Sequence, residues 1–290
     1  MESGKPRRRH FVLVHGVCHG AWCWYKVATI LESAGHRVTA LDMAACGASA
    51  ARVEEVRTFE EYSWPLLDAV AAVPTGEKVV LVGHSFGGHN LALAMQWHPE
   101  KVAVAVFVSA AVPFAGRRMS LFLEQLFEFG MTSLLFSDDV VRGHQHMEEQ
   151  STPPDSFLGS TFGTVERGSD DPPETILLGP EWMSQKMYQL SPPEDLRLAT
   201  MLVRPAQMYL KDGTMTGEGV LTEGKYGAVS RVLVVTEEDK TWPAEEQRRM
   251  AASCVPSVEV RAIVGADHMP MFSKPAELAQ LIMEVAEKYT

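Results

Sequence analysis

The chain has 290 residues, 46% of them hydrophobic, which is enough for one large α/β domain with an insertion. Its formal net charge of −11 argues against nucleic acid or an anionic membrane as a partner, because such binding requires a basic surface. No apolar run approaches the roughly 20 residues that cross a bilayer, and residues 1–10 lack the apolar stretch of a secretory signal. The four cysteines are irregularly spaced, so we expect no disulfide framework and a reducing, cytoplasmic location.

The first part of the chain alternates short apolar runs with helical patterns. The sequence predicts strands over residues 10–14, 37–41, 78–82 and 102–109, and helices over 21–32, 58–73 and 90–97. Thr58 and Glu61 form a capping-box pattern at the start of the second helix. Continuous apolar strands that alternate with helices indicate a mostly parallel sheet covered on both faces.

Val79–Gly88 is the most informative stretch and reads Val-Val-Leu-Val-Gly-His-Ser-Phe-Gly-Gly. It places Ser85 in a Gly-x-Ser-x-Gly pattern between a predicted strand and a predicted helix, which is typical of a nucleophilic serine. Gly83 and Gly87 carry no Cβ, so the turn can close tightly and present the serine hydroxyl above the sheet edge. The alternative is a turn that needs small residues, with Ser85 serving only as a helix N-cap.

The alternation stops at about residue 112, and phenylalanine, methionine and proline become frequent. We expect an inserted, mainly helical cap over residues 112–226, and a core formed by residues 1–111 and 227–290. The cap either forms a small core of its own or lines an apolar substrate pocket. Its Phe and Met residues are Phe122, Phe127, Phe129, Met131, Phe136, Met147, Phe157, Phe162, Met183 and Met187.

The last part of the chain returns to the alternating pattern, with strands expected over 231–236 and 258–264. A helix is expected over 242–253, and Ser273 is expected to cap a terminal helix that runs to about residue 288.

A reactive serine requires a general base and an acid that orients the base, in the chain order serine, acid, histidine. His268 follows the last predicted strand and is the expected base. Asp239 follows the preceding strand by three residues and is the expected acid, with Glu238 as the alternative. The side chain of Asp267 should point elsewhere.

A tetrahedral intermediate also needs two N–H groups aimed at its oxyanion. Phe86, the residue after the serine, should supply one of them. The Val17 N–H, in the loop after the first strand, should supply the other, because Gly16 lets that loop approach closely.

His15, Cys18 and His19 could suggest a metal site, but no carboxylate or further cysteine joins them in a recognised spacing. We therefore expect no metal and no cofactor, and we expect His15 to pack under its loop. The side chain of His84 should diverge from its neighbour Ser85. The histidines expected on the surface or in the cap are His89, His98, His144 and His146.

These segments resemble the plant methylesterase and hydroxynitrile lyase group of the α/β-hydrolase superfamily, and the resemblance extends over nearly the whole chain. The matching stretches are residues 15–22, 58–67, 81–88, 190–205 and 265–269. The resemblance implies an α/β-hydrolase fold, a mostly helical cap over a deep apolar pocket, and a triad of Ser85, Asp239 and His268.

Two positions separate the two chemistries of this group. Lyases that resemble this chain carry threonine where it has Gly16 and lysine where it has Met269, and they use these groups to bind the cyanohydrin and to stabilise leaving cyanide. Here Gly16 leaves the oxyanion loop free to approach a tetrahedral intermediate, and Met269 is expected to add an apolar side chain to the wall of the pocket. The sequence therefore favours the methylesterase-like branch.

The expected function is that of a serine carboxylesterase acting on small apolar esters through an acyl-enzyme. In family terms the substrates are methyl esters such as methyl salicylate, methyl jasmonate or methyl indole-acetate. The alternatives are a small-molecule receptor on a hydrolase scaffold and, less favoured, a hydroxynitrile lyase. The expected partners are the small ester and, in a homodimer, a second copy of the chain. Residues 117–172 match the group least, so the acyl group is not predicted.

Overall fold

The computed structural model describes residues 8–124, 158–163 and 175–290. Six described strands form one parallel sheet in the order β2-β1-β3-β4-β8-β9. These strands are β1 (His10–Val14), β2 (Arg37–Leu41), β3 (Val79–His84), β4 (Val102–Val108), β8 (Ser230–Thr236) and β9 (Glu259–Ile263). All six residues of β3 are buried, whereas the edge strands β2 and β9 are largely half-buried or exposed, as expected when helices cover the centre of a parallel sheet.

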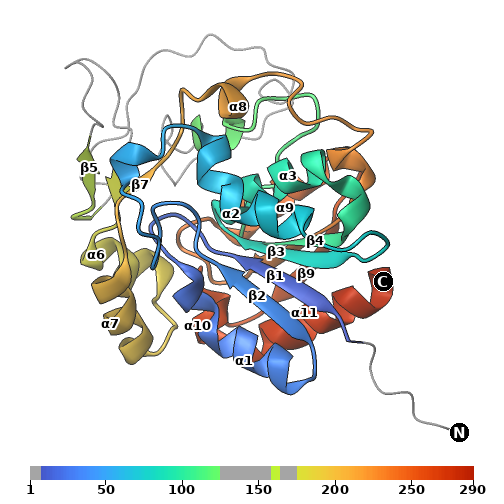
Figure 1. Cartoon of the computed structure of the whole chain (residues 1–290). Coiled ribbons are helices and arrows are strands. Elements are labelled where there is room, and N and C mark those ends of the chain that lie inside the picture. The colour runs from blue at the N-terminus through green and yellow to red at the C-terminus, as the bar shows by residue number, and fades with distance from the viewer. Residues whose placement is uncertain (1–7, 125–157, 164–174) are drawn as a thin grey trace, which may run out of the picture.

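Helices cover both faces of the sheet (Figure 1). One face carries α1 (Tyr25–Ser33), α10 (Pro270–Ser273) and α11 (Pro275–Tyr289). The other carries α2 (Phe59–Ala71), α3 (Gly87–Trp97) and α9 (Ala244–Ser253). Short 3-10 helices lie at Ala21–Trp24, Val53–Glu55, Pro99–Lys101 and Tyr226–Ala228. The predicted fold class, a parallel sheet with helices on both faces, is confirmed.

Two predicted helix starts differ in detail from the structure. The Thr58 hydroxyl accepts a hydrogen bond from the Glu61 N–H (3.1 Å), as expected for an N-cap, but the Glu61 carboxylate accepts from the Arg57 N–H (2.8 Å). The prediction that Ser273 caps the terminal helix is wrong. Ser273 ends α10, and α11 begins two residues later at Pro275, where proline needs no N–H partner and its fixed φ suits the first turn.

The described segments between β4 and β8 contain short helices and a second sheet. The helices are α6 (Pro180–Trp182), a π-helical turn (Met183–Met187), α7 (Pro193–Leu202) and α8 (Gly213–Thr216). The antiparallel sheet is β5 (Thr161–Gly163), β6 (Thr175–Leu177) and β7 (Ala206–Gln207), which the sequence did not predict. Six of the Phe and Met residues expected in the cap lie outside the described residues: Phe127, Phe129, Met131, Phe136, Met147 and Phe157.

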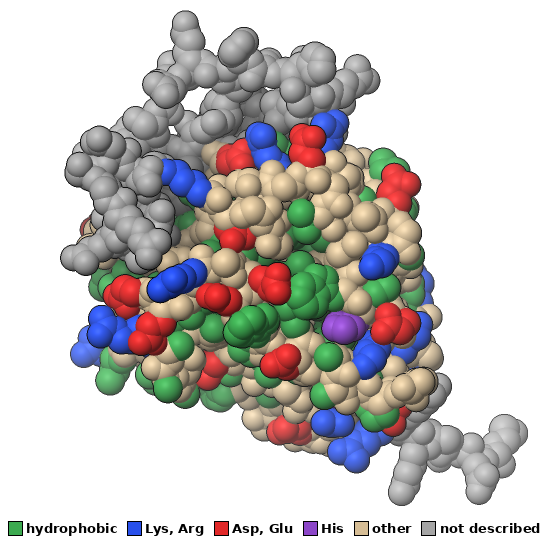
Figure 2. Space-filling view, turned by 45° about the horizontal axis from the view of Figure 1, so that its top comes forward, with side chains coloured by type: hydrophobic (Ala, Val, Ile, Leu, Met, Phe, Trp, Pro, Cys, Tyr) green, Lys and Arg blue, Asp and Glu red, His purple; other side chains and the backbone are tan. Residues whose placement is uncertain are grey.

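Acidic and basic side chains are interspersed with apolar ones on the face drawn in Figure 2. This differs from the continuous basic surface that nucleic-acid binding uses. Within the described ranges, every helix is too short or too polar to cross a lipid bilayer.

Candidate active site

Ser85 lies at the apex of the turn between β3 and α3, with a backbone φ of +52°. A residue with a side chain pays about 1–3 kcal/mol to stay in such a conformation, so the surrounding structure must hold it there. The Ser85 N–H donates to the Val108 carbonyl (3.2 Å), and the Ser85 carbonyl accepts from the Gly88 N–H (3.1 Å). The turn is therefore tied both to the neighbouring strand and to its own helix.

The glycines around Ser85 are required by close packing. A Cβ on Gly87 would lie 2.8 Å from the His15 carbonyl oxygen, and one on Gly83 would lie 2.7 Å from Leu91 Cδ1. A Cβ on Gly16 would lie 2.9 Å from His84 Nδ1. The loop after β1 therefore packs directly against the serine turn, as the sequence predicted for Gly16.

His268 and Asp239 form a buried pair at the ends of β9 and β8. The His268 Nδ1 lies 2.7 Å from Asp239 Oδ2, and both side chains are almost fully buried. A carboxylate only accepts hydrogen bonds, so Nδ1 carries the ring proton and donates a hydrogen bond to Asp239. The other ring nitrogen, Nε2, has no hydrogen-bond partner in the part of the chain described, and its lone pair is available as a base.

Four further donors hold the Asp239 carboxylate. Oδ1 accepts from the N–H groups of Thr241 (2.7 Å) and Trp242 (2.8 Å). Oδ2 accepts from Gln247 Nε2 (3.1 Å) and from the Thr236 hydroxyl (3.2 Å). These bonds compensate for taking a charged carboxylate out of water.

The hydrogen bonds of Asp239 favour it over Glu238, the other acid that the sequence left open. Glu238, the alternative, is exposed to solvent and does not contact His268 in the described structure. Sequence reasoning missed Thr236 and Gln247, because nothing in their spacing marks them as partners of Asp239. It also missed Ser109, whose hydroxyl hydrogen-bonds Thr236.

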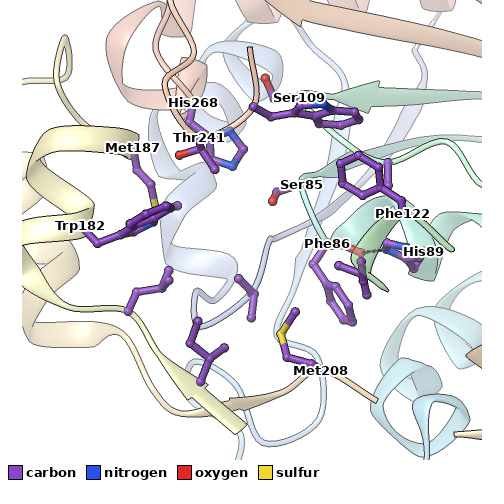
Figure 3. A pocket seen from close by; sticks show the side chains of 16 residues that line it. Ser85, Phe86, His89, Ser109, Phe122, Trp182, Met187, Met208, Thr241 and His268 are labelled. Atoms are coloured by element: carbon purple, nitrogen blue, oxygen red, sulfur yellow. Dashed lines mark hydrogen bonds between the residues drawn. The ribbon is translucent and has the colours of Figure 1, made fainter. Parts of the chain in front are cut away.

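Ser85 and His268 line one apolar cavity and lie next to each other in it (Figure 3). The cavity has a volume of about 90 Å³. None of the described residues that line it carries a permanent charge. Its apolar lining is Val17, Phe86, Ala111, Phe122, Leu123, Ile176, Leu178, Trp182, Met187, Met208 and Trp242.

Val17 and Phe86, the predicted oxyanion donors, both line this cavity beside Ser85. Among the described residues, neither backbone N–H has a hydrogen-bond acceptor. Phe86 also precedes the first turn of α3, where helix N–H groups favour negative charge. Both groups are thus available to an oxyanion at the serine.

The structure does not place Met269 in the cavity wall, which corrects the expectation from the sequence. The Met269 side chain is fully buried and is not among the described residues that line the cavity. Its N–H donates to Asp267 Oδ1 (3.0 Å), and α10 begins at the next residue, so the chain turns away from the cavity at this point.

His89 corrects a second expectation, because it is buried and lines the cavity. It lies one helical turn after Ser85, and its Nδ1 donates to the Phe86 carbonyl (3.2 Å). Burial lowers the pKa of His89 to about 4, so the ring is neutral at pH 7. His98 is half-buried, and His144 and His146 lie outside the described residues.

The other buried histidines are neutral and hold loops. His84 diverges from Ser85 as expected, and its Nε2 donates to the His268 carbonyl (2.8 Å). His15 packs under its loop, where Nδ1 donates to the Gly16 carbonyl (2.8 Å) and Nε2 accepts from the Met43 N–H (3.0 Å). Burial lowers the pKa of both rings below the usual value of histidine.

The side chains of the suspected metal site are engaged elsewhere. The Cys18 thiol donates to the Ile176 carbonyl (3.2 Å), and both ring nitrogens of His19 are hydrogen-bonded. In the described residues, no three His, Cys, Asp or Glu side chains gather so that they could hold a metal ion.

Comparison with known proteins identifies the family. A model described as the alpha/beta hydrolase family matches residues 11–281. The chain is 49% identical over 290 residues to the probable esterase PIR7A of Oryza sativa subsp. indica, covering 100% of both chains. It is 44% identical over 286 residues to methyl jasmonate esterase 1 of Vitis vinifera, covering 99% of this chain and 100% of that one.

The crystal structure of polyneuridine aldehyde esterase is also similar, with a TM-score of 0.83 and 39% identity. The match covers 97% of this chain and 100% of that one. The resemblance predicted from the motifs is confirmed: the chain belongs to the alpha/beta hydrolase family, in the group of plant esterases and methylesterases.

Proposed function

We propose that the chain is a serine carboxylesterase that hydrolyses small apolar esters, above all methyl esters. The observation that carries this proposal is the 2.7 Å pair of His268 and Asp239, whose histidine lines the same cavity as Ser85, among described lining residues without a permanent charge. Esterases and methylesterases among the relatives support the same reaction class. Hydrolysis of an ester through an acyl-enzyme needs no cofactor.

In the first half of the reaction, Ser85 Oγ attacks the ester carbonyl while His268 Nε2 takes the hydroxyl proton. Asp239 holds the ring in the required tautomer and stabilises the imidazolium. The N–H groups of Val17 and Phe86 hold the oxyanion, and one such donor contributes about 3–4 kcal/mol to transition-state stabilisation. His268 then returns the proton to the leaving alkoxide, and the alcohol departs.

In the second half, water attacks the acyl-Ser85 carbonyl while His268 Nε2 removes one of its protons. The same two N–H groups hold the second oxyanion. The intermediate collapses, His268 returns the proton to Ser85 Oγ, and the carboxylic acid is released. The lining offers this acid no cation among its described residues, which favours its departure once ionised.

The cavity supports an apolar acyl group. Aromatic and aliphatic side chains surround the space beside Ser85, and the room it offers suits a small ester. The similarity to methyl jasmonate esterase 1 favours methyl esters of apolar acids as the substrate class.

Gly16 weighs against the lyase alternative. The lyases that the chain resembles carry threonine at this position. In this structure even the Cβ of such a side chain would lie 2.9 Å from His84 Nδ1 and 3.0 Å from Ser85 Cβ, which leaves no room for it. The paired His268 and Asp239 weigh against the receptor alternative, because a site that only binds would not need a base oriented by a buried carboxylate.

The test is hydrolysis of a panel of methyl esters and a short activated ester by the purified protein and by Ser85→Ala. We expect turnover by the wild type, covalent labelling by a serine-reactive phosphonate, and loss of both in the variant. Retained turnover in Ser85→Ala would remove Ser85 as the nucleophile. Tight binding of an apolar acid without labelling would favour a receptor, and cyanide release from mandelonitrile would favour a lyase.

We also propose a cytoplasmic location. All four cysteines, Cys18, Cys23, Cys46 and Cys254, are free and buried, which suits a reducing compartment. The homodimer stays a prediction. Sedimentation velocity tests it by measuring the oligomeric state in solution.

A further inference from the structure

One short segment of the insertion hydrogen-bonds the loops that carry the reacting groups. We call residues 186–191 the clasp segment; it links the π-helical turn to α7. Its bonds are Tyr188 Oη to His19 Nε2 (2.6 Å), Gln189 Nε2 to the Glu238 carbonyl (2.6 Å), Thr241 Oγ1 to the Lys186 carbonyl (2.9 Å), and the Leu190 N–H (2.9 Å) and Ser191 Oγ (2.8 Å) to Asp267 Oδ2. The segment therefore contacts the Val17, Asp239 and His268 loops at once.

Asp267 is the centre of these contacts. Its carboxylate is fully buried. While Oδ2 accepts from the clasp segment, Oδ1 accepts from the Met269 N–H (3.0 Å) and from Ser273 Oγ (2.8 Å). Asp267 thus accepts from four neutral donors, two in the clasp segment and two at the ends of α10, and it joins the clasp segment to that helix. Burying a carboxylate without a cation is costly even when it is hydrogen-bonded, so filling space alone does not account for an aspartate here.

The position of Asp267 in the chain gives this link a consequence for the base. Asp267 immediately precedes His268, whose own carbonyl is held by His84 (2.8 Å). One residue earlier, the Ala266 carbonyl accepts from the Glu238 N–H (3.1 Å), which joins the loops of the base and the acid. The backbone of His268 is therefore fixed on both sides, and the clasp segment contacts the loops of the base and of the acid.

The oxyanion loop is held in the same way. His19 Nδ1 lies 2.8 Å from the Val17 carbonyl, which can only accept, so this nitrogen carries the ring proton. Nε2 is then an acceptor, and the Tyr188 hydroxyl donates to it. Burial lowers the pKa of His19 to about 4 and keeps the ring in this neutral form. The clasp segment thus reaches the backbone of Val17 through one histidine.

We propose that Asp267 is a positioning residue for His268, and that the clasp segment acts through it to set the geometry of the reaction. The inference rests on the proposed esterase function and deepens it. It gives part of the insertion a role in the rate of the chemical step, in addition to lining the cavity. Misplacing a reacting group by about 1 Å can cost about 100-fold in rate, so a modest shift of the His268 loop should be measurable.

The test compares two matched serine variants and one aspartate variant. S191A and S273A each delete one 2.8 Å hydroxyl bond to Asp267, the first from the clasp segment and the second from α10. We expect S191A to lower kcat about tenfold, the effect of losing one hydrogen bond to a charged group. S273A should lower it at most about threefold, because the Ser273 hydroxyl shares its one proton between Asp267 and the Met269 carbonyl (3.3 Å) and its loss weakens the Asp267 contact less. D267N should lower kcat about 100-fold, and adding S191A to D267N should change little more.

The readout separates positioning from folding. Rates are divided by the number of Ser85 residues that a phosphonate finally labels, so unfolded protein does not count. We expect a normal labelling endpoint, a lower kcat and a KM within about twofold of the wild type. A normalised kcat for S191A equal to that of the wild type, or a loss in S273A as large as in S191A, would overturn the inference. If D267N fails to fold, the serine pair still decides.

The same assay distinguishes the two proposals. An inactive, unlabelled wild type would contradict the esterase function itself. An active wild type with an unaffected S191A would contradict only the role of Asp267 and the clasp segment.

Discussion

The sheet core and the inserted region contribute differently to the same cavity. The core supplies Ser85, Asp239 and His268, each in a loop at the carboxyl end of a strand of the parallel sheet and each held by several hydrogen bonds. The insertion supplies apolar lining such as Trp182 and Met187. The difference indicates that the reaction class is built into the core, whereas the choice of acyl group depends on the insertion. The clasp segment is the exception, because it belongs to the insertion and contacts the reacting loops.

The largest effect should come from the core. Asp239→Asn should leave the site intact in shape but favour the wrong tautomer of His268, lowering kcat by about 10⁴-fold with little change in KM. Steady-state kinetics on a methyl ester, with circular dichroism to verify folding, measures this. A variant within about tenfold of the wild type would contradict the assigned role of Asp239.

The second prediction concerns acid stability, which should also depend on the core. Burial lowers the pKa of His19 and His89 to about 4 in the folded state, compared with about 6.5 in the unfolded chain. Between these values the unfolded chain binds protons that the folded one does not, so the free energy of unfolding should fall as the pH drops from about 6.5 to 4. Each of the two rings contributes on the order of 3 kcal/mol to this change in the free energy of unfolding. The whole of that stabilisation is present above pH 6.5.

Urea unfolding at pH 7.5, 6 and 4.5 tests this dependence. His89→Gln should show a shallower loss of stability on acidification than the wild type, because one of the buried rings whose pKa is lowered on folding is gone. Equal slopes for both proteins would show that His89 is not held neutral by burial.

The third prediction concerns the packing of the serine turn. Gly87→Ala would bring a Cβ to 2.8 Å from the His15 carbonyl oxygen and should destabilise the protein by about 1–3 kcal/mol while lowering kcat. Gly213→Ala in α8 of the insertion is the matched control, since a Cβ there meets no atom within 4 Å. Chemical denaturation should show the control within about 0.5 kcal/mol of the wild type. Similar losses in both variants would contradict the packing argument.

The smallest effect should come from the insertion. Met187 lies in the clasp segment, but its side chain lines the cavity and makes none of the hydrogen bonds of that segment. Met187→Ala should therefore raise KM for a bulky apolar methyl ester by about tenfold, with kcat nearly unchanged. For methyl acetate, which does not fill the cavity, KM should change less. A fall in kcat with constant KM for both esters would place Met187 with the reacting groups and remove the contrast between the two regions.

The places of Ser85, Asp239 and His268 in the fold were predictable because strands, turns and the loops that follow them leave local signals. Ser85 lies in a glycine turn, and Asp239 and His268 each follow an apolar strand, so the parallel sheet alone brings them to one edge. The oxyanion loop was predictable on the same grounds, from Gly16 after the first strand.

The remaining features depend on contacts between distant segments. The link between Ser191 and Asp267 joins residues 76 positions apart, and no local pattern predicts it. His89 was misplaced because α3 packs between the sheet and α2, so its polar residues are buried with the apolar ones. Strands of two or three residues, such as β7, are too short for an alternating pattern. The cap boundaries at residues 112 and 226 stay a prediction.

Trapping the acyl-enzyme tests the central claim most directly. The protein is mixed with an activated ester of an apolar acid, quenched in acid within the first turnover, digested and analysed by mass spectrometry. We predict that the acyl mass is found on the peptide that contains Ser85, and that it is absent in Ser85→Ala. Rapid hydrolysis with no acyl group on Ser85, or with the acyl group on another residue, would contradict the account.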